Sequence, residues 1–216
     1  MNKKKVFVIA LAVCLLAILS FSTLAWFSDS DTVTNKFHVA TSADPADPDD
    51  IFSVDVQEKV DTDGDGVADQ VIAKGDDTNG QTYENIYPSQ VLVKEPLVKN
   101  TGAYGQYIRM NVTVDESFDA MAGDLNTCLQ GYDANLWSFA GKRTENGKVT
   151  YVYYLNKVLE KDQSETLFTH VVIPAQLDQE DMATLNGGFT MEIVAEAVQS
   201  DNTGDNAVDA FALVNP

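Results

Sequence analysis

Hydrophobic and polar residues alternate along most of the chain beyond its first thirty residues, and this two-residue period is typical of half-buried β-strands. The segments between the alternating runs are rich in Gly, Pro, Asn and Asp, which favour turns. About nine strands with turn signals every 8 to 12 residues predict an all-β fold, a single jelly-roll or β-sandwich domain. The predicted strands cover residues 32–39, 51–60, 67–73, 90–98, 107–114, 136–144, 148–156, 167–173 and 189–199.

Two kinds of local signal add detail to this pattern. Asn146 and Gly147 separate two alternating runs, and both residues tolerate the positive φ of a type I′ turn, so a tight hairpin is predicted there. Helical periodicity is confined to residues 117–130 and 178–185, the second opening on Asp178 as a helix cap. The sequence therefore predicts one or two short helices beside the strands.

The N-terminal segment has a different composition from the rest. Residues 3–5 are lysines, residues 6–19 are apolar, and Thr23 and Ala25 place small side chains at the −3 and −1 positions of a cleavage site. We therefore expect residues 1–25 to form a signal helix that is cleaved between Ala25 and Trp26. A retained membrane anchor is the alternative, because about 20 uncharged residues are enough to span a bilayer.

The mature chain is expected to divide into a strand and a domain. Residues 26–41 are predicted to form an N-terminal strand with Val33, Phe37 and Val39 on its apolar face. Residues 42–216 follow as the single domain, which opens on a Pro- and Asp-rich connector that cannot sustain a ladder of hydrogen bonds. This length suits one domain of ordinary size.

Charge and cysteine content narrow the range of partners. The chain has 14 basic and 33 acidic side chains, a net charge of −19, which excludes nucleic acid as a partner and opposes binding to anionic membranes. Membrane contact is then expected only through an uncleaved signal. The same charge favours divalent cations. Cys14 lies in the signal, so Cys128 has no partner for a disulfide and is predicted to be a small buried apolar residue.

The stretch DTDGDGVADQVI, residues 61–72, has the spacing of a calcium-binding loop, with Gly66 at its sharp turn. Ile72 stands where such loops carry a bidentate Glu, so further ligands would come from water, Asp76 or Asp77. The flanks alternate like strands, which predicts a calcium-bound hairpin; a solvated Asp/Gly turn is the alternative. The predicted calcium ligands are the carboxylates of Asp61, Asp63, Asp65 and Asp69 and the carbonyl of Val67.

Sequence motifs of enzymes are scarce. The two histidines, His38 and His170, do not form an H-E-x-x-H pair, and the chain has no G-x-S-x-G motif and no Gly-rich phosphate loop. With 33 carboxylates, chance acidic pairs carry no information about catalysis. We predict no catalytic residue and no organic cofactor, and the absence of a zinc motif argues against zinc.

Three stretches resemble a known family. TLAWFSDSDTVTNKF (residues 23–37), YENIYPSQVLVKEPLVKNTGAYGQYIRMNVTV (83–114) and FTMEIVAEAVQSDN (189–202) are similar to the TasA/camelysin family. These are exported proteins of Gram-positive bacteria that are processed by a SipW-type signal peptidase. The resemblance implies a jelly-roll domain secreted to the cell surface or the biofilm matrix, where TasA assembles into fibres.

The resemblance also implies how such a protein finds its partners. Fibre formation in that family resembles donor-strand exchange, in which the N-terminal strand of one subunit completes the sheet of the next. Residues 26–39 suit this role, and the expected partners are further copies of the chain or related matrix subunits. The alternative is that the segment forms an ordinary edge strand of its own domain.

Three functions follow as hypotheses. The first is a secreted structural protein that self-assembles by β-strand addition and is stiffened by calcium. The second is a surface metalloprotease, because the family label includes that activity for camelysin, although no zinc cluster is recognisable here. The third is a monomeric, calcium-dependent adhesin or binding module.

Overall fold

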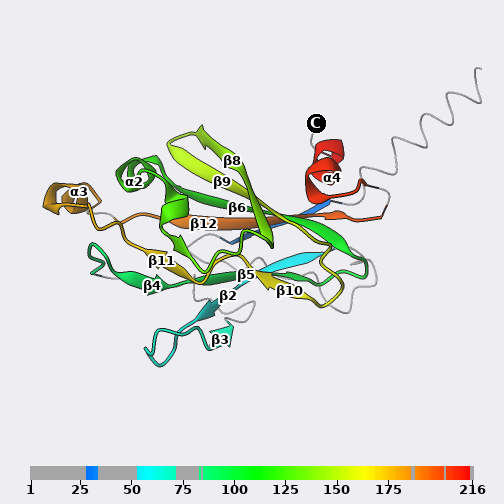
Figure 1. The fold of residues 1–216 in the computed structure, drawn as a ribbon, viewed down its shortest axis with the longest axis horizontal. Helices are drawn as coiled ribbons and strands as arrows, with labels where there is room; N and C mark the ends of the chain where they lie inside the picture. The colour runs from blue at the N-terminus through cyan, green and yellow to red at the C-terminus, as the bar shows by residue number, and fades with distance from the viewer. Residues whose placement is uncertain are drawn as a thin grey trace, which may run out of the picture.

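The computed structural model describes residues 28–33, 53–71, 83, 85–185, 188–201 and 203–214 (Figure 1). These residues fold mainly into antiparallel β-strands arranged in three sheets, so the predicted all-β fold is confirmed. Twelve strands are seen in the described residues, against nine predicted. The predicted run 90–98 is split in two, and residues 129–130 and 164–166 form strands where none was predicted.

The largest sheet has five strands and forms one layer of the molecule. Its order places β12, the last strand of the chain, between β1 and β6. The strands follow one another across the sheet in the order β1 (Ser28–Val33), β12 (Met191–Gln199), β6 (Gln106–Asp115), β9 (Lys148–Leu155) and β8 (Trp137–Glu145).

Two smaller sheets form the layer below it in Figure 1. The four-stranded sheet consists, in order, of β10 (Ser164–Thr166), β5 (Glu95–Asn100), β2 (Val54–Val60) and β3 (Gln70–Val71). The three-stranded sheet consists, in order, of β4 (Val91–Val93), β11 (His170–Val172) and β7 (Leu129–Gln130).

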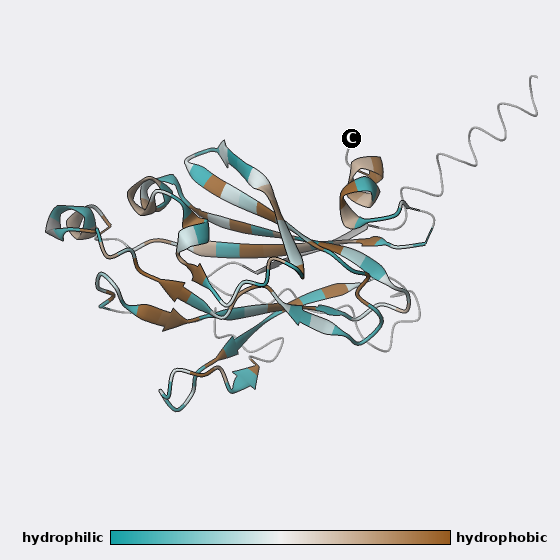
Figure 2. Ribbon diagram, viewed as in Figure 1, coloured by the Kyte–Doolittle hydropathy of each residue, from teal (hydrophilic) through white to brown (hydrophobic). Residues whose placement is uncertain are grey.

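The core lies between these layers and follows from the alternation in the sequence. Every second residue of β6 and β12 is apolar and points into one cluster, which also contains Val56 and Val98 from the facing layer. Ile108 and Met110 of β6 and Ile193 of β12 have no exposed surface. Burial of each such side chain contributes about 1.5–3 kcal/mol. The alternating brown and pale bands on these strands mark this pattern in Figure 2.

The predicted hairpin is present as β8–β9. Asn146 and Gly147 have φ values of 52° and 74°, the positive values that a type I′ turn requires. The strands pair from Glu145↔Lys148 at the turn to Trp137↔Leu155, with one irregularity between Phe139 and Gly141.

The helices agree only in part with the prediction. The helix expected at 178–185 is present as α3 (Gln179–Thr184), where Asp178 caps the backbone amides of Glu180 and Asp181 at 2.8 and 2.9 Å. The helix expected over 117–130 is wrong beyond α2 (Glu116–Ala122).

The second half of that predicted helix adopts other structures. Gly123 follows α2 with a φ of 79°, and Asp124 caps a short 3-10 helix, η2 (Leu125–Thr127), before β7 begins. The polar cap and the left-handed glycine end the α-helix there. Near the C-terminus, α4 (Ala207–Val214) covers part of the outer face of the large sheet. None of the described helices is long and apolar enough to cross a membrane.

The N-terminal strand is described only in part. β1 begins at Ser28, earlier than the expected residue 32, and pairs in antiparallel register with β12 of the same chain; residues 34–39 of the expected strand lie outside the described residues. The predicted signal with its Ala25–Trp26 cut, and Phe37 and Val39, lie outside the described residues. The predicted division of the chain into signal, strand and domain therefore stays a prediction.

Candidate metal centre

The candidate metal loop joins β2 to β3. Among the described residues the two strands pair at Lys59↔Val71 and Val60↔Gln70. Residues 67–69 of the predicted strand 67–73 are not in a strand, and residues 72 and 73 lie outside the described range. The reason is local: carboxylates accept the backbone N–H groups of residues 64–67, and these amides are then unavailable to a β-ladder. Gly64 and Gly66 have φ values of 80° and 88°, which let the loop fold back on itself.

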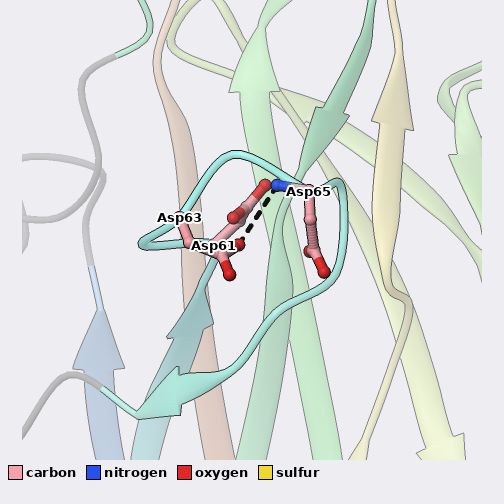
Figure 3. A group of neighbouring side chains, drawn as sticks. All are labelled: Asp61, Asp63 and Asp65. Carbon is pink, nitrogen blue, oxygen red and sulfur yellow. Dashed lines mark hydrogen bonds between the residues drawn. The ribbon is translucent and has the colours of Figure 1, made fainter.

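Three predicted ligands are brought together in this loop (Figure 3). One carboxylate oxygen from each of Asp61, Asp63 and Asp65 lies within 4.8 Å of the other two. The dashed line in Figure 3 is the hydrogen bond that the Asp65 amide donates to the Asp63 carboxylate at 3.2 Å. Asp63 and Asp65 are exposed and Asp61 is half-buried, so an ion from solvent can reach all three.

Asp61 organises the turn. Its two carboxylate oxygens accept the amide of Gly64 at 2.6 Å and that of Gly66 at 2.8 Å. These hydrogen bonds, led by that of Gly66, hold the pKa of Asp61 below its ordinary value, because they stabilise the ionised carboxylate. The first position of the loop is thus an anion across the neutral pH range.

The other predicted ligands occupy different places. The Asp69 carboxylate accepts the Thr62 amide at 3.2 Å and the Thr62 hydroxyl at 2.9 and 3.0 Å, so it closes the base of the loop and is not part of the three-carboxylate group. Val67 donates its amide to Asp65 at 2.8 Å, and its side chain is exposed. Ile72, Asp76 and Asp77 lie outside the described residues.

The donor set suits a hard cation. Carboxylate oxygens on a flexible loop are the ligands of calcium, which takes six to eight oxygens. Asp61, Asp63 and Asp65 would supply the first three, and water and loop carbonyls would supply the rest. Soft or borderline metals prefer nitrogen or sulfur, and the group contains neither.

Sequence reasoning missed a contact that ties this loop to the domain. His170 of β11 places Nε2 3.2 Å from the Gly66 carbonyl oxygen, and its Nδ1 lies 2.8 Å from the Thr169 hydroxyl. The two contacts are compatible when Nε2 carries the proton and donates to Gly66. His170 is 104 residues away in the chain, so no local pattern could have indicated the contact.

Other polar clusters of the described residues hold the fold together. Buried Lys94 pairs with both carboxylate oxygens of buried Glu58 at 2.9 Å, and this pair interrupts the predicted strand 90–98 between β4 and β5. Burial raises the pKa of Glu58 and lowers that of Lys94. Among the described residues, no other group of three or more His, Cys, Asp or Glu side chains is close enough to hold a metal. Cys128 is buried and unpaired, as predicted.

One cleft lies on the outer side of the large sheet. It has a volume of about 280 Å³ and lies between the end of β9 and the start of α4, with Tyr107, Tyr154 and Val208 in its wall. Two of its polar side chains bind each other, with Ser138 donating to Asn156 at 2.7 Å.

The chain was compared with protein families, curated proteins and solved structures. No protein-family model, no curated protein and no solved structure matches the chain.

Proposed function

We propose that this chain is an exported structural protein of a cell surface or biofilm matrix, which self-associates by exchange of its N-terminal strand and is stiffened by calcium at residues 61–69. The place of β1 carries the proposal. β1 lies at the edge of the five-stranded sheet and is paired with β12 over six residues. The similarity of three sequence stretches to the TasA/camelysin family supports the same function.

An edge strand of this kind is suited to exchange. β1 has the sequence SDSDTV, with one apolar residue in six, and pairs with β12 along its whole described length. A neighbouring copy can supply the same strand in the same register, and the hydrogen bonds lost and gained are then equivalent. Exchange therefore costs little enthalpy, and protein concentration decides its extent.

The connection between β1 and β2 is long enough to reach a neighbour. Residues 34–53 separate the two strands, and twenty residues span at most about 70 Å when fully extended. A strand on such a tether can leave its own domain without disturbing β2.

Calcium is assigned a supporting role in this function. A cation bound by Asp61, Asp63 and Asp65 would fix the loop that closes the β2–β3 hairpin, which has two pairs in the described part of the chain. Protein with a net charge of −19 would also repel its copies less once cations are bound. Assembly is therefore expected to be stronger in millimolar calcium.

Electron microscopy of a deletion variant tests the strand exchange. Removal of residues 28–33 takes β1 away, and fibres are expected to disappear while the domain stays folded by circular dichroism. A deletion of equal length at 42–47, which shortens the connector and keeps β1, serves as the control and is expected to form fibres. Undiminished fibres from the variant without β1 would overturn the proposal.

A monomeric calcium-dependent binding module is the second candidate, and one observation favours it. β1 pairs with β12 of its own chain, which completes the sheet without a partner. Mass photometry with and without about 2 mM calcium, which exceeds the dissociation constants of about 0.1–1 mM typical of extracellular sites, separates the two. A single monomer peak in both conditions supports the binding module, and a ladder of multiples supports the structural protein.

A further inference from the structure

The most deeply buried ion pair among the described residues joins Lys94 to Glu58. The Lys94 Nζ lies 2.9 Å from each of the two Glu58 carboxylate oxygens, and the side chains are 3% and 2% exposed. An ion pair buried this deeply contributes little net stability, because the lost hydration of two charges offsets their attraction. Its place in the core therefore calls for a use other than that of two separate charges.

The surrounding strands hold both groups in position. Glu58 lies on the same side of β2 as the core residue Val56, and its backbone is paired with Pro96 of β5. Lys94 lies between β4 and β5 in the layer of the two smaller sheets (Figure 1), and its backbone N–H donates to the Thr169 carbonyl oxygen at 3.1 Å. The amine and the carboxylate thus meet from backbone positions that hydrogen bonds have already fixed.

The distances suit attack of the amine on the carboxyl carbon. A nitrogen 2.9 Å from both oxygens lies about 3 Å from the carbon between them, close to the ~3–3.5 Å that separates reacting atoms in a near-attack arrangement. Rotation about the terminal bond of Glu58, which has a broad torsional preference, can turn the face of the carboxyl group toward the nitrogen. Lysine amines act as nucleophiles on carbonyl carbons when their surroundings remove the charge.

Burial also favours the protonation states that this attack needs. It raises the pKa of Glu58 and lowers the pKa of Lys94, because each charged form loses its hydration. Passage of one proton along the existing hydrogen bond, from Nζ to a carboxylate oxygen, converts the ion pair into a neutral amine beside a neutral carboxylic acid. These are the two reactants of an amide condensation.

We propose that Lys94 and Glu58 join in an intramolecular isopeptide bond once the chain has folded. The lone pair of Nζ attacks Cδ of Glu58, so an N–C bond forms and one C–O bond breaks. The departing hydroxyl group takes a proton from the nitrogen, and the products are an amide and one water molecule. The reaction consumes no oxidant, metal or other reactant. Escape of the water to solvent leaves the amide in the dry core and opposes hydrolysis.

The bond would supply a covalent link of a kind that cysteine does not provide in the described part of the chain, where Cys128 is buried and free. Glu58 and Lys94 are 36 residues apart, and the segment between them contains β3 and the loop of residues 61–69. A cross-link over such a segment removes conformational freedom from the unfolded chain. The link depends neither on strand exchange nor on calcium, so it can be present in a monomer without metal.

Mass spectrometry of the intact full chain tests the bond. The wild type is expected to be lighter than the sequence from its observed N-terminus by one water molecule. Lys94→Arg keeps the positive charge but has no primary amine, and it is expected to have its full mass. Lys59→Arg is the matched control, because Lys59 pairs with Glu95 over the same separation but is 36% exposed, and it is expected to keep the loss of water. A wild type of full mass would overturn the proposal.

Dehydration elsewhere is separated by the same variants. An Asp-Gly pair such as Asp65-Gly66 can also lose water, and that loss would persist in Lys94→Arg, so an equal loss in the wild type and Lys94→Arg overturns the proposal. Peptide mapping of the wild type does not depend on the folding of a variant. Trypsin is expected to leave the bond after Lys94 uncut and to yield one branched peptide with both residues. Separate, unmodified peptides for Glu58 and Lys94 would refute the bond.

Discussion

The β8–β9 and β2–β3 hairpins reach the same topology by different means. β8–β9 closes through the two residues Asn146 and Gly147 and is held by eight residue pairs. Within the described residues β2–β3 has two pairs, and it closes through a loop whose backbone amides are held by carboxylates. The first hairpin is fixed by its own backbone and by the core. The second depends on side chains and, in our proposal, on a cation, so the two should respond differently to substitution, calcium and acid.

The largest effect is expected in the β8–β9 hairpin. The Tyr151 hydroxyl donates to Asp119 at 2.5 Å and accepts the Leu125 amide at 3.1 Å. Tyr151→Phe leaves that buried amide without an acceptor, and unfolding by urea should show a loss of about 1–3 kcal/mol. Tyr153→Phe is the matched control. The Tyr153 hydroxyl donates to the Asn126 side chain at 2.6 Å, accepts no buried backbone amide, and its loss should cost less. Equal costs would contradict this account of the network.

Calcium should act only through the β2–β3 hairpin. A site with a dissociation constant of about 0.1–1 mM stabilises the native state by about 1.4–2.7 kcal/mol in 10 mM calcium. The melting temperature is expected to rise accordingly by several degrees. Asp63→Ala combined with Asp65→Ala should abolish the rise, while Tyr151→Phe should keep it. A full rise in the double Asp variant would show that the loop is not the site.

Glycine substitutions compare the two turns directly. Gly147 and Gly64 have φ values of 74° and 80°, and a Cβ would meet no atom within 4 Å at either position. Alanine therefore costs about 1–2 kcal/mol of backbone strain at each. Denaturation should register this cost for Gly147→Ala and less of it for Gly64→Ala, because the acidic loop can open locally without global unfolding. A larger loss for Gly64→Ala would reverse the comparison.

His170 should have a smaller effect, confined to the acidic loop. His170→Ala removes the contact with the Gly66 carbonyl and is expected to cost about 0.5–1.5 kcal/mol locally. Hydrogen exchange of the Gly64 and Gly66 amides should speed up several-fold, and that of the β8–β9 amides should not change. Unchanged exchange in the loop would mean that His170 does not tie it to β11.

Acid should weaken slightly the contact that holds the β8–β9 hairpin to β6 at Lys148. Burial tends to raise the pKa of Asp115, but the Lys148 ammonium at 2.7 Å and the Thr190 amide at 2.8 Å lower it below its ordinary value of 3.8. The stability from Asp115 is therefore present above pH 3.8 and lost as pH falls through the folded pKa. Urea unfolding from pH 6 to pH 3 should show a smaller loss for Asp115→Asn than for the wild type. Equal losses would show that Asp115 does not contribute to the loss of stability in acid.

The sequence predicted best where local signals decide the structure. Alternation located the core strands, and the Asn146-Gly147 pair located the tight hairpin, because the turn chemistry lies in adjacent residues. The gathering of Asp61, Asp63 and Asp65 also followed from spacing along one loop. In contrast, the contact of His170 with Gly66 and the split of the 90–98 run at Lys94 depend on residues distant in the chain. No period or motif carries such tertiary information.

The position of β12 has a consequence for the order in which the molecule is completed. β1 pairs with a strand that lies 160 to 170 residues further along the chain. A chain is synthesised from its N-terminus, at about 5–20 residues per second, so β1 waits for roughly ten seconds or longer before its own partner exists. During that interval β1 cannot close the sheet of its own molecule, so the pairing with β12 is the last step that completes the five-stranded sheet.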